Sequence, residues 1–186
     1  MATVSSYNYY TDVFIAGGTG NLGQHATRAF LKHPTKASVQ ILVRKESAEK
    51  AQELQELGAK LVFGDLATLS HQELCEMLKG VEVVVCILSG EARSLQLKLL
   101  KASVESGVKK FLPSSYGIDY NRLNYGVSAV LDSVKKVADE VIQSGLEYLK
   151  FSISLCLDVR EQLLIVISLC LCNLGEYNPS QLFNKN

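Results

Sequence analysis

A glycine-rich segment near the amino terminus separates a short apolar run from an amphipathic stretch. The apolar run is Val13 to Ala16, and from Gly17 to Gly23 the glycines recur at the spacing G-x-x-G-x-x-G, with Gly18 added beside the first. The following stretch, Gly23 to His33, has apolar residues near helical spacing and stops at Pro34. The order strand, glycine turn, helix is typical of the first unit of a dinucleotide-binding fold.

Apolar runs and amphipathic stretches continue to alternate along the chain. Further strands are predicted at Val39 to Val43, Lys60 to Phe63, Val81 to Leu88, Lys110 to Pro113 and Leu146 to Ile153. Helices are predicted between them at Glu46 to Leu57, Ser70 to Leu78, Leu95 to Val104 and Val127 to Ser144. This alternation predicts an α/β fold, a Rossmann-type doubly wound parallel sheet with helices on both faces. The run Val81 to Leu88 is the strongest strand pattern and is expected to be central.

The pattern weakens after about Leu157. We therefore predict a NAD(P)-binding Rossmann domain over residues 1–157 and a divergent tail over residues 158–186. The portion that would build a substrate pocket is expected to be short or missing. A truncated or alternative ending is one hypothesis for this tail.

Composition argues against several classes of partner. Nineteen basic residues balance nineteen acidic ones, which gives no long-range attraction for nucleic acid. The longest apolar run, Leu163 to Cys172, is about half of the roughly 20 residues that span a bilayer, and no secretory signal is visible. The five cysteines form no C-x-x-C pair. We expect a cytoplasmic protein with no membrane segment and no direct contact with nucleic acid.

Each glycine of the turn has a physical task in such a site. One allows the chain to turn sharply off the strand, Gly20 allows the backbone to approach phosphates, and Gly23 allows the helix to pack closely on the sheet. The helix amino terminus adds N–H groups and a partial positive charge. The segment therefore predicts a pyrophosphate site, the alternative being a plain tight turn.

The end of the second strand bears on the choice between the two nicotinamide dinucleotides. An acidic residue there would bind the ribose 2′-hydroxyl, whereas a cation would bind a 2′-phosphate. The residues present are Arg44 and Lys45. A guanidinium matches a phosphate with two parallel hydrogen bonds, so NADP is predicted, and a solvated surface pair is the alternative.

The glycine turn, the Leu42-Val43-Arg44 strand end, Gly64-Asp65-Leu66 and the segment Phe111 to Gly117 together resemble the NmrA-like and isoflavone-reductase-like family of atypical short-chain dehydrogenases. The resemblance covers about Val13 to Phe151. It implies a fold that binds NADP and serves either reductases of small organic substrates or regulators that bind the dinucleotide without turning it over.

The resemblance also implies which residues contact the cofactor. The pyrophosphate would be lined by Gly17, Thr19, Gly20, Asn21, Leu22 and Gly23. Arg44 and Lys45 would contact the 2′-phosphate. Asp65 and Leu66 would lie near the adenine. The ribose and nicotinamide would lie along Leu88, Ser89 and Gly90. For Asp65, closure of a turn is an equal alternative.

Fewer residues are candidates for catalysis than for cofactor binding. Reductases of this family have a lysine at the start of the helix before the sixth strand, and the aligned position here is Val134, followed by Lys135 and Lys136. Lys135 is the candidate, with a surface charge as the alternative. Tyr116 is a second candidate, with packing as its alternative.

Two functions remain open. The first is an NADPH-dependent oxidoreductase of the isoflavone-reductase-like type acting on a small-molecule substrate, and the second is a non-catalytic NADP(H) sensor that binds a regulatory protein partner. A fragment without function is a third possibility. His25 and His71 lie on predicted helices, with no cysteine or carboxylate expected at metal spacing. We interpret both as structural and predict no metal site.

Overall fold

The computed structural model describes residues 9–115 and 124–149. Within these residues the strands are β1 (Asp12–Ala16), β2 (Ser38–Val43), β3 (Lys60–Phe63), β4 (Val83–Cys86), β5 (Lys110–Leu112) and β6 (Glu147–Tyr148). The α-helices are α1 (Asn21–Lys32), α2 (Ala48–Glu56), α3 (His71–Met77), α4 (Gln96–Glu105) and α5 (Ala129–Gln143). Two short 3-10 helices, η1 (Lys45–Ser47) and η2 (Gly90–Leu95), precede α2 and α4.

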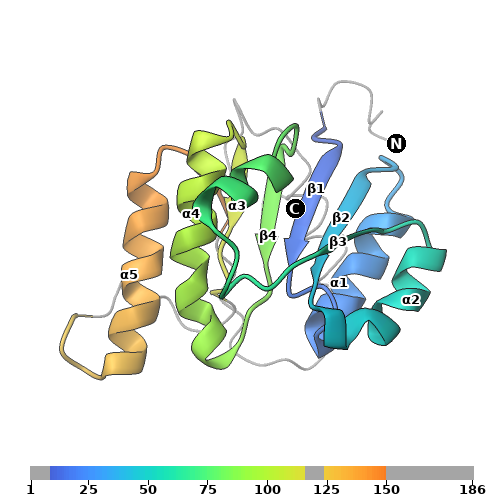
Figure 1. The fold of residues 1–186 in the computed structure, drawn as a ribbon. Coiled ribbons are helices and arrows are strands. Elements are labelled where there is room, and N and C mark those ends of the chain that lie inside the picture. Colours follow the sequence, from blue (N-terminus) through green and yellow to red (C-terminus); the bar gives the residue numbers. More distant parts are fainter. Residues whose placement is uncertain (1–8, 116–123, 150–186) are drawn as a thin grey trace, which may run out of the picture.

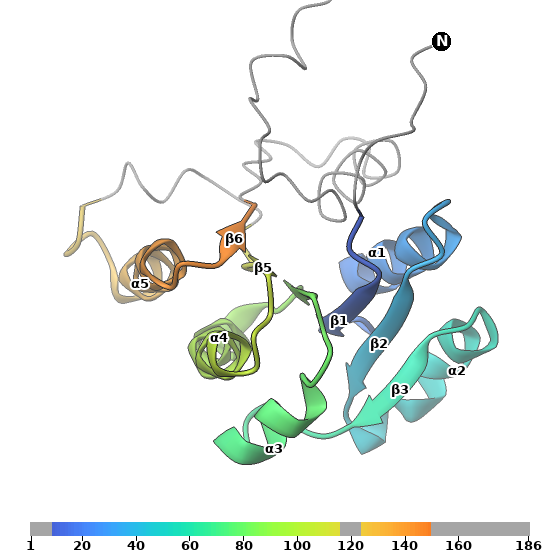
Figure 2. The ribbon, with the colours of Figure 1, turned by 90° about the horizontal axis from the view of Figure 1, so that it is seen from above.

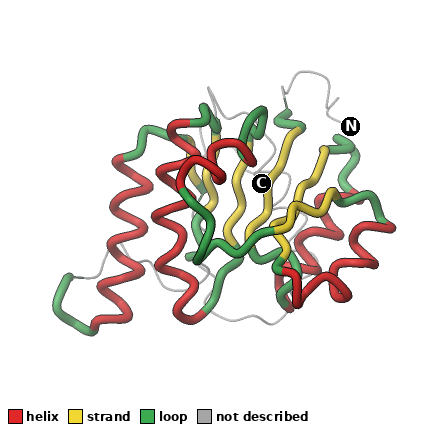
Figure 3. Tube along the Cα trace, viewed as in Figure 1, coloured by secondary structure: helices red, strands yellow, loops and turns green. Residues whose placement is uncertain are grey.

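All six strands are parallel and follow the order β3-β2-β1-β4-β5-β6. This is the strand order of a Rossmann fold, and the predicted fold class is confirmed. The strands lie together as one sheet with helices around it (Figure 3). The strand predicted to be central, β4, pairs with β1 on one side and β5 on the other. It is shorter than the predicted run, ending at Cys86.

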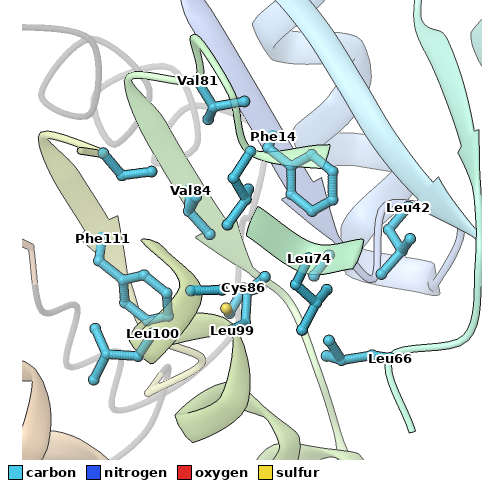
Figure 4. Packing of buried hydrophobic residues seen from close by; sticks show 14 of the residues in the cluster. Phe14, Leu42, Leu66, Leu74, Val81, Val84, Cys86, Leu99, Leu100 and Phe111 are labelled. Carbon is cyan, nitrogen blue, oxygen red and sulfur yellow. The ribbon is translucent and has the colours of Figure 1, made fainter. Parts of the chain in front are cut away.

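Two apolar layers sandwich the sheet, because alternate residues of each buried strand point to opposite faces. Val13 and Ile15 of β1 pack with Phe30 of α1 and Leu54 of α2. Phe14 packs on the other face, in a cluster that reaches α3, α4 and α5. Figure 2 shows the two groups of helices on opposite sides of the sheet, and Figure 4 shows part of the second cluster.

Local sequence explains where the helices begin. Gly20 precedes α1, and Ser70 begins α3 with a capping box in which Ser70 and Glu73 exchange hydrogen bonds between side chain and backbone. Ser128 begins α5, its hydroxyl accepting a hydrogen bond from the Leu131 N–H. Because β1 and β4 are parallel neighbours, the glycine turn after β1 and the end of β4 lie at the same edge of the sheet (Figure 1).

Among the described residues, no helix is both long and apolar enough to cross a membrane. The predicted strand Leu146 to Ile153 is present at Glu147–Tyr148, and its part beyond residue 149 lies outside the described residues. The predicted tail over residues 158–186 lies outside them as well.

Candidate dinucleotide site

A cavity of about 650 Å³ opens at the carboxyl ends of the strands. It begins where β1 and β4 lie side by side, the point at which the chain crosses from one half of the sheet to the other. Ligands of doubly wound folds bind in the crevice at this point. The cavity is lined by Ala16, Gly17, Thr19, Gly20, Leu42, Arg44, Ser47, Lys50, Gly64, Asp65, Leu66, Ala67, Ile87, Leu88, Ser89, Glu91, Ala92 and Leu95.

The glycine turn forms one wall of the cavity. Gly17 has a φ of +91°, and a Cβ on it would lie 2.2 Å from the Ile87 carbonyl oxygen. A Cβ on Gly23 would lie 2.0 Å from the Gly17 carbonyl oxygen. These two glycines therefore allow the sharp turn and the close approach of α1, as the sequence predicts.

Gly20 differs from its neighbours because the space beside it is open. A Cβ built there would meet only the Gly17 carbonyl oxygen, at 3.4 Å. Gly20 is also the N-cap of α1, where no side chain caps the helix and no acidic residue lies in the first turn. The helix thus presents its partial positive charge next to an open space, which fits the pyrophosphate of a dinucleotide.

Cationic groups also line the cavity. Arg44 lines it at the end of β2, and its exposed guanidinium Nε lies 3.4 Å from Glu46 Oε1. Such an exposed pair contributes little stability, so the guanidinium can exchange Glu46 for a phosphate. Lys50 of α2 and Ser47 also line the cavity, although the sequence pattern does not predict them. Lys45, which the pattern does predict, is exposed and is not among the lining residues.

Asp65 both closes a turn and lines the cavity. Its Oδ1 accepts a hydrogen bond from the Ala67 N–H at 2.9 Å. Leu66 beside it is buried. The two alternatives for Asp65 are therefore compatible, because the turn places the residue at the cavity wall.

The β4 end is held against the β5 end by a buried serine. Ser114 Oγ accepts from the Leu88 N–H at 2.9 Å and donates to the Leu88 carbonyl at 2.6 Å. The Ser114 N–H donates to the Gln96 side chain at 2.5 Å, which adds α4 to the connection. These bonds fix Leu88 and Ser89, two predicted contacts, at the wall of the cavity.

Besides Lys45, four predicted contacts are absent from the cavity wall. Asn21 and Leu22 form the first turn of α1, with Asn21 exposed, Gly23 is buried against the glycine turn, and Gly90 begins η2. The expected contribution of Asn21, Leu22 and Gly23 is through the backbone at the start of α1. The contact of each with a cofactor stays a prediction.

Lys135 does not line the cavity. Its ammonium lies 3.1 Å from Asp139 Oδ1 and 5.0 Å from the centre of the Tyr125 ring. Tyr125 in turn donates a 2.6 Å hydrogen bond to Asp139, which raises the pKa of Tyr125 to about 12. Tyr116, the other catalytic candidate, lies outside the described residues.

One premise of the metal prediction is wrong. His71 has Cys75 and Glu105 beside it, with the nearest ligand atoms of the three residues within 4.8 Å of one another. Cys75 stands four residues after His71, a spacing visible in the sequence, whereas Glu105 comes from another helix. His25 is exposed on α1.

The fold and the cavity define a dinucleotide-type Rossmann unit. Residues 10–159 match the model of the NmrA-like family, and the chain belongs to this family. It is 32% identical over 144 residues to isoeugenol synthase 1 of Petunia hybrida, covering 73% of this chain and 44% of that protein.

Solved structures agree with this family. AtPrR2 with NADP+ and (+)pinoresinol has a TM-score of 0.66 and 30% identity, covering 75% of this chain and 48% of that one. Leucoanthocyanidin reductase of Vitis vinifera, in binary complex with NADPH, has a TM-score of 0.67 and 28% identity. The match covers 77% of this chain and 49% of that one. The chain thus spans less than half the length of these relatives.

Proposed function

We propose that this chain binds NADP(H) in the cavity beside the glycine turn and supplies the cofactor-binding half of an NADPH-dependent reductase. The observation that carries the proposal is the match between the cavity and the charges of such a cofactor. The start of α1 and the open space at Gly20 suit the pyrophosphate, while Arg44 and Lys50 suit the 2′-phosphate. Relatives solved with NADP+ and NADPH support the choice of cofactor.

The residues of this chain would bind and orient the cofactor. Leu42 and Leu66 offer apolar surface to the adenine, and Leu88 and Ser89 lie where the nicotinamide end would be placed. NADPH supplies a hydride when bound, and its transfer depends on how the substrate is held against the nicotinamide. We further propose residues 1–157 as this binding unit and 158–186 as a divergent tail, which the family match over residues 10–159 supports.

The cofactor choice is tested by calorimetric titration with NADPH and NADH. We expect NADPH to bind at least tenfold more tightly than NADH. Arg44→Ala should weaken NADPH binding by roughly 10- to 100-fold, because a charge-assisted hydrogen bond contributes about 1.5–3 kcal/mol. Lys50→Ala should weaken it by about tenfold, and neither change should affect NADH much.

Lys45→Ala is the matched control, because Lys45 adjoins Arg44 but does not line the cavity. Its NADPH affinity should equal that of the parent chain. Equal affinities of the parent chain for NADPH and NADH would contradict the 2′-phosphate site.

We propose that the reaction is reduction of a small organic substrate, for which pinoresinol, bound by AtPrR2, is the first candidate. Lys135 is the proposed acid or ribose-orienting group. If Lys135 is the acid, Lys135→Ala should lower kcat by about 100-fold, the low end for loss of an acid or base, with unchanged affinity for NADPH. If it orients the ribose, the affinity for NADPH should fall as well. Lys136→Ala, on the exposed side of the same helix, is the control. NADPH absorbance follows the reaction.

A second candidate function is an NADP(H) sensor without turnover. The position of Lys135 favours it, because the ammonium is engaged by Asp139 and lies off the cavity wall. A sensor would bind NADPH, and Arg44→Ala would weaken this binding, but the sensor would oxidise none of the NADPH. A protein partner captured with only one redox form of the cofactor would then identify the sensor.

A further inference from the structure

Three side chains with metal-binding atoms meet on the side of the sheet covered by α3 and α4. His71 and Cys75 stand one turn apart on α3, and Glu105 is the last residue of α4, which packs beside α3 (Figure 2). His71 Nε2 lies 2.6 Å from Glu105 Oε2 and 3.6 Å from Cys75 Sγ. None of the three lines the dinucleotide cavity.

The separation of His71 and Cys75 suits a tetrahedral ion. Zinc binds imidazole nitrogen at about 2.0–2.1 Å and thiolate sulfur at about 2.3 Å, which places the two ligand atoms about 3.6 Å apart at a tetrahedral angle. The His71–Cys75 separation is 3.6 Å. Glu105 would withdraw from His71 to about 3.4 Å, and its side chain, 66% exposed, is able to do so.

The backbone under these side chains is well fixed. The capping box of Ser70 and Glu73 holds the first turn of α3, and Leu74 between the two ligands is fully buried in the core. Ser106 Oγ donates a 3.3 Å hydrogen bond to the Cys75 carbonyl, which joins α3 to the end of α4. An ion would therefore meet ligands whose helices are already in place.

The donor set indicates which ion fits. Mg²⁺ and Ca²⁺ prefer oxygen ligands alone, whereas one imidazole, one thiolate and one carboxylate suit Zn²⁺. Three protein ligands leave a fourth position for water, and the half-exposed His71 side chain leaves an entrance for the ion.

We propose that His71, Cys75 and Glu105 form a Zn²⁺ site that links α3 to α4, separate from the dinucleotide cavity. The exposed contact between His71 and Glu105 contributes little by itself. Bound zinc would replace it with bonds from one ion to both helices and so stabilise the folded chain.

The test is titration of the reduced, metal-free chain with Zn²⁺, and with Co²⁺ as a spectroscopic probe. Because other thiols also bind zinc, every variant is made in a chain with Cys156, Cys170 and Cys172 replaced by Ser. We expect one Zn²⁺ per chain, a thiolate-to-cobalt charge-transfer band, and a rise in Tm of roughly 5 °C or more with zinc about 100-fold above its Kd. Mg²⁺ should produce no such rise.

Single substitutions at each ligand decide the matter. His71→Ala, Cys75→Ser and Glu105→Gln should each weaken zinc binding at least tenfold, and Cys75→Ser should remove the charge-transfer band. His25→Ala changes an exposed histidine on α1, and Glu76→Gln changes the exposed carboxylate next to Cys75 that pairs with Lys79. Neither change should affect zinc binding. Circular dichroism checks that each variant folds. His71 and Glu105 are both exposed, so their substitution is not expected to affect folding. Absence of binding, or binding that survives the ligand substitutions, would overturn the proposal.

Discussion

Gly23→Ala is expected to lower the free energy of unfolding by about 3 kcal/mol and Tm by roughly 6–12 °C. The added methyl carbon would lie 2.0 Å from the Gly17 carbonyl oxygen and 2.9 Å from the Gly18 carbonyl carbon. Both contacts are with backbone, so no flexible side chain can move to relieve them. Helix α1 would have to move away from β1, which would reduce the packing of Phe30 in the core. Urea unfolding followed by circular dichroism measures the loss.

Gly20→Ala is the matched control, three residues earlier in the same turn. Its Cβ would have only one neighbour, the Gly17 carbonyl oxygen at 3.4 Å, and Gly20 has an extended backbone with φ −72° that alanine adopts freely. We expect its stability to stay within about 1 kcal/mol of the parent chain, since alanine is only a poorer N-cap. Equal stability of the two variants would show that α1 does not depend on close packing at Gly23.

The fold could be predicted from sequence because its signals are local. The strand β4 has Val83, Val84 and Val85 in succession, all buried, as expected of a strand covered by helices on both faces. Ser70 and Pro34 mark a helix start and a helix end by their own chemistry. The sheet order then follows from the alternation of strands and helices that is typical of the Rossmann fold.

The walls of the cavity could be predicted only in part. Arg44 is predictable because it immediately follows a strand, whereas Lys45 next to it begins η1 and is not on the cavity wall. Ser47, the last residue of η1, and Lys50 of α2 line the cavity instead. The sequence pattern places the helix start at Glu46, whereas α2 begins at Ala48, so the pattern does not show which residues face the cavity.

The cluster of His71, Cys75 and Glu105 shows a different limit. Two of its members lie four residues apart and share a helix face, which the sequence does reveal. Glu105 reaches them only because α4 packs beside α3. His71 and Glu105 are 34 residues apart in the sequence, and their contact is set by the packing of helices on the sheet. Helix periodicity does not reveal such a contact.

The largest expected effect on function is that of Gly20→Val, which should weaken NADPH binding at least a thousandfold, a loss of about 4 kcal/mol or more. The valine side chain would project into the open space at the start of α1, where the proposed pyrophosphate lies. It would keep the phosphates away from the helix N–H groups and from the partial charge that they present. Calorimetric titration with NADPH measures the loss, and circular dichroism confirms the fold.

The comparison with Gly23 separates this effect from unfolding. Valine adopts the extended backbone of Gly20, so Gly20→Val should fold, whereas Gly23→Ala should be unstable. The NADPH affinity of Gly20→Ala should lie between those of Gly20→Val and the parent chain. One methyl group occupies less of the open space than the branched side chain of valine does. NADPH binding by folded Gly20→Val at the affinity of the parent chain would place the pyrophosphate elsewhere and overturn the proposed site.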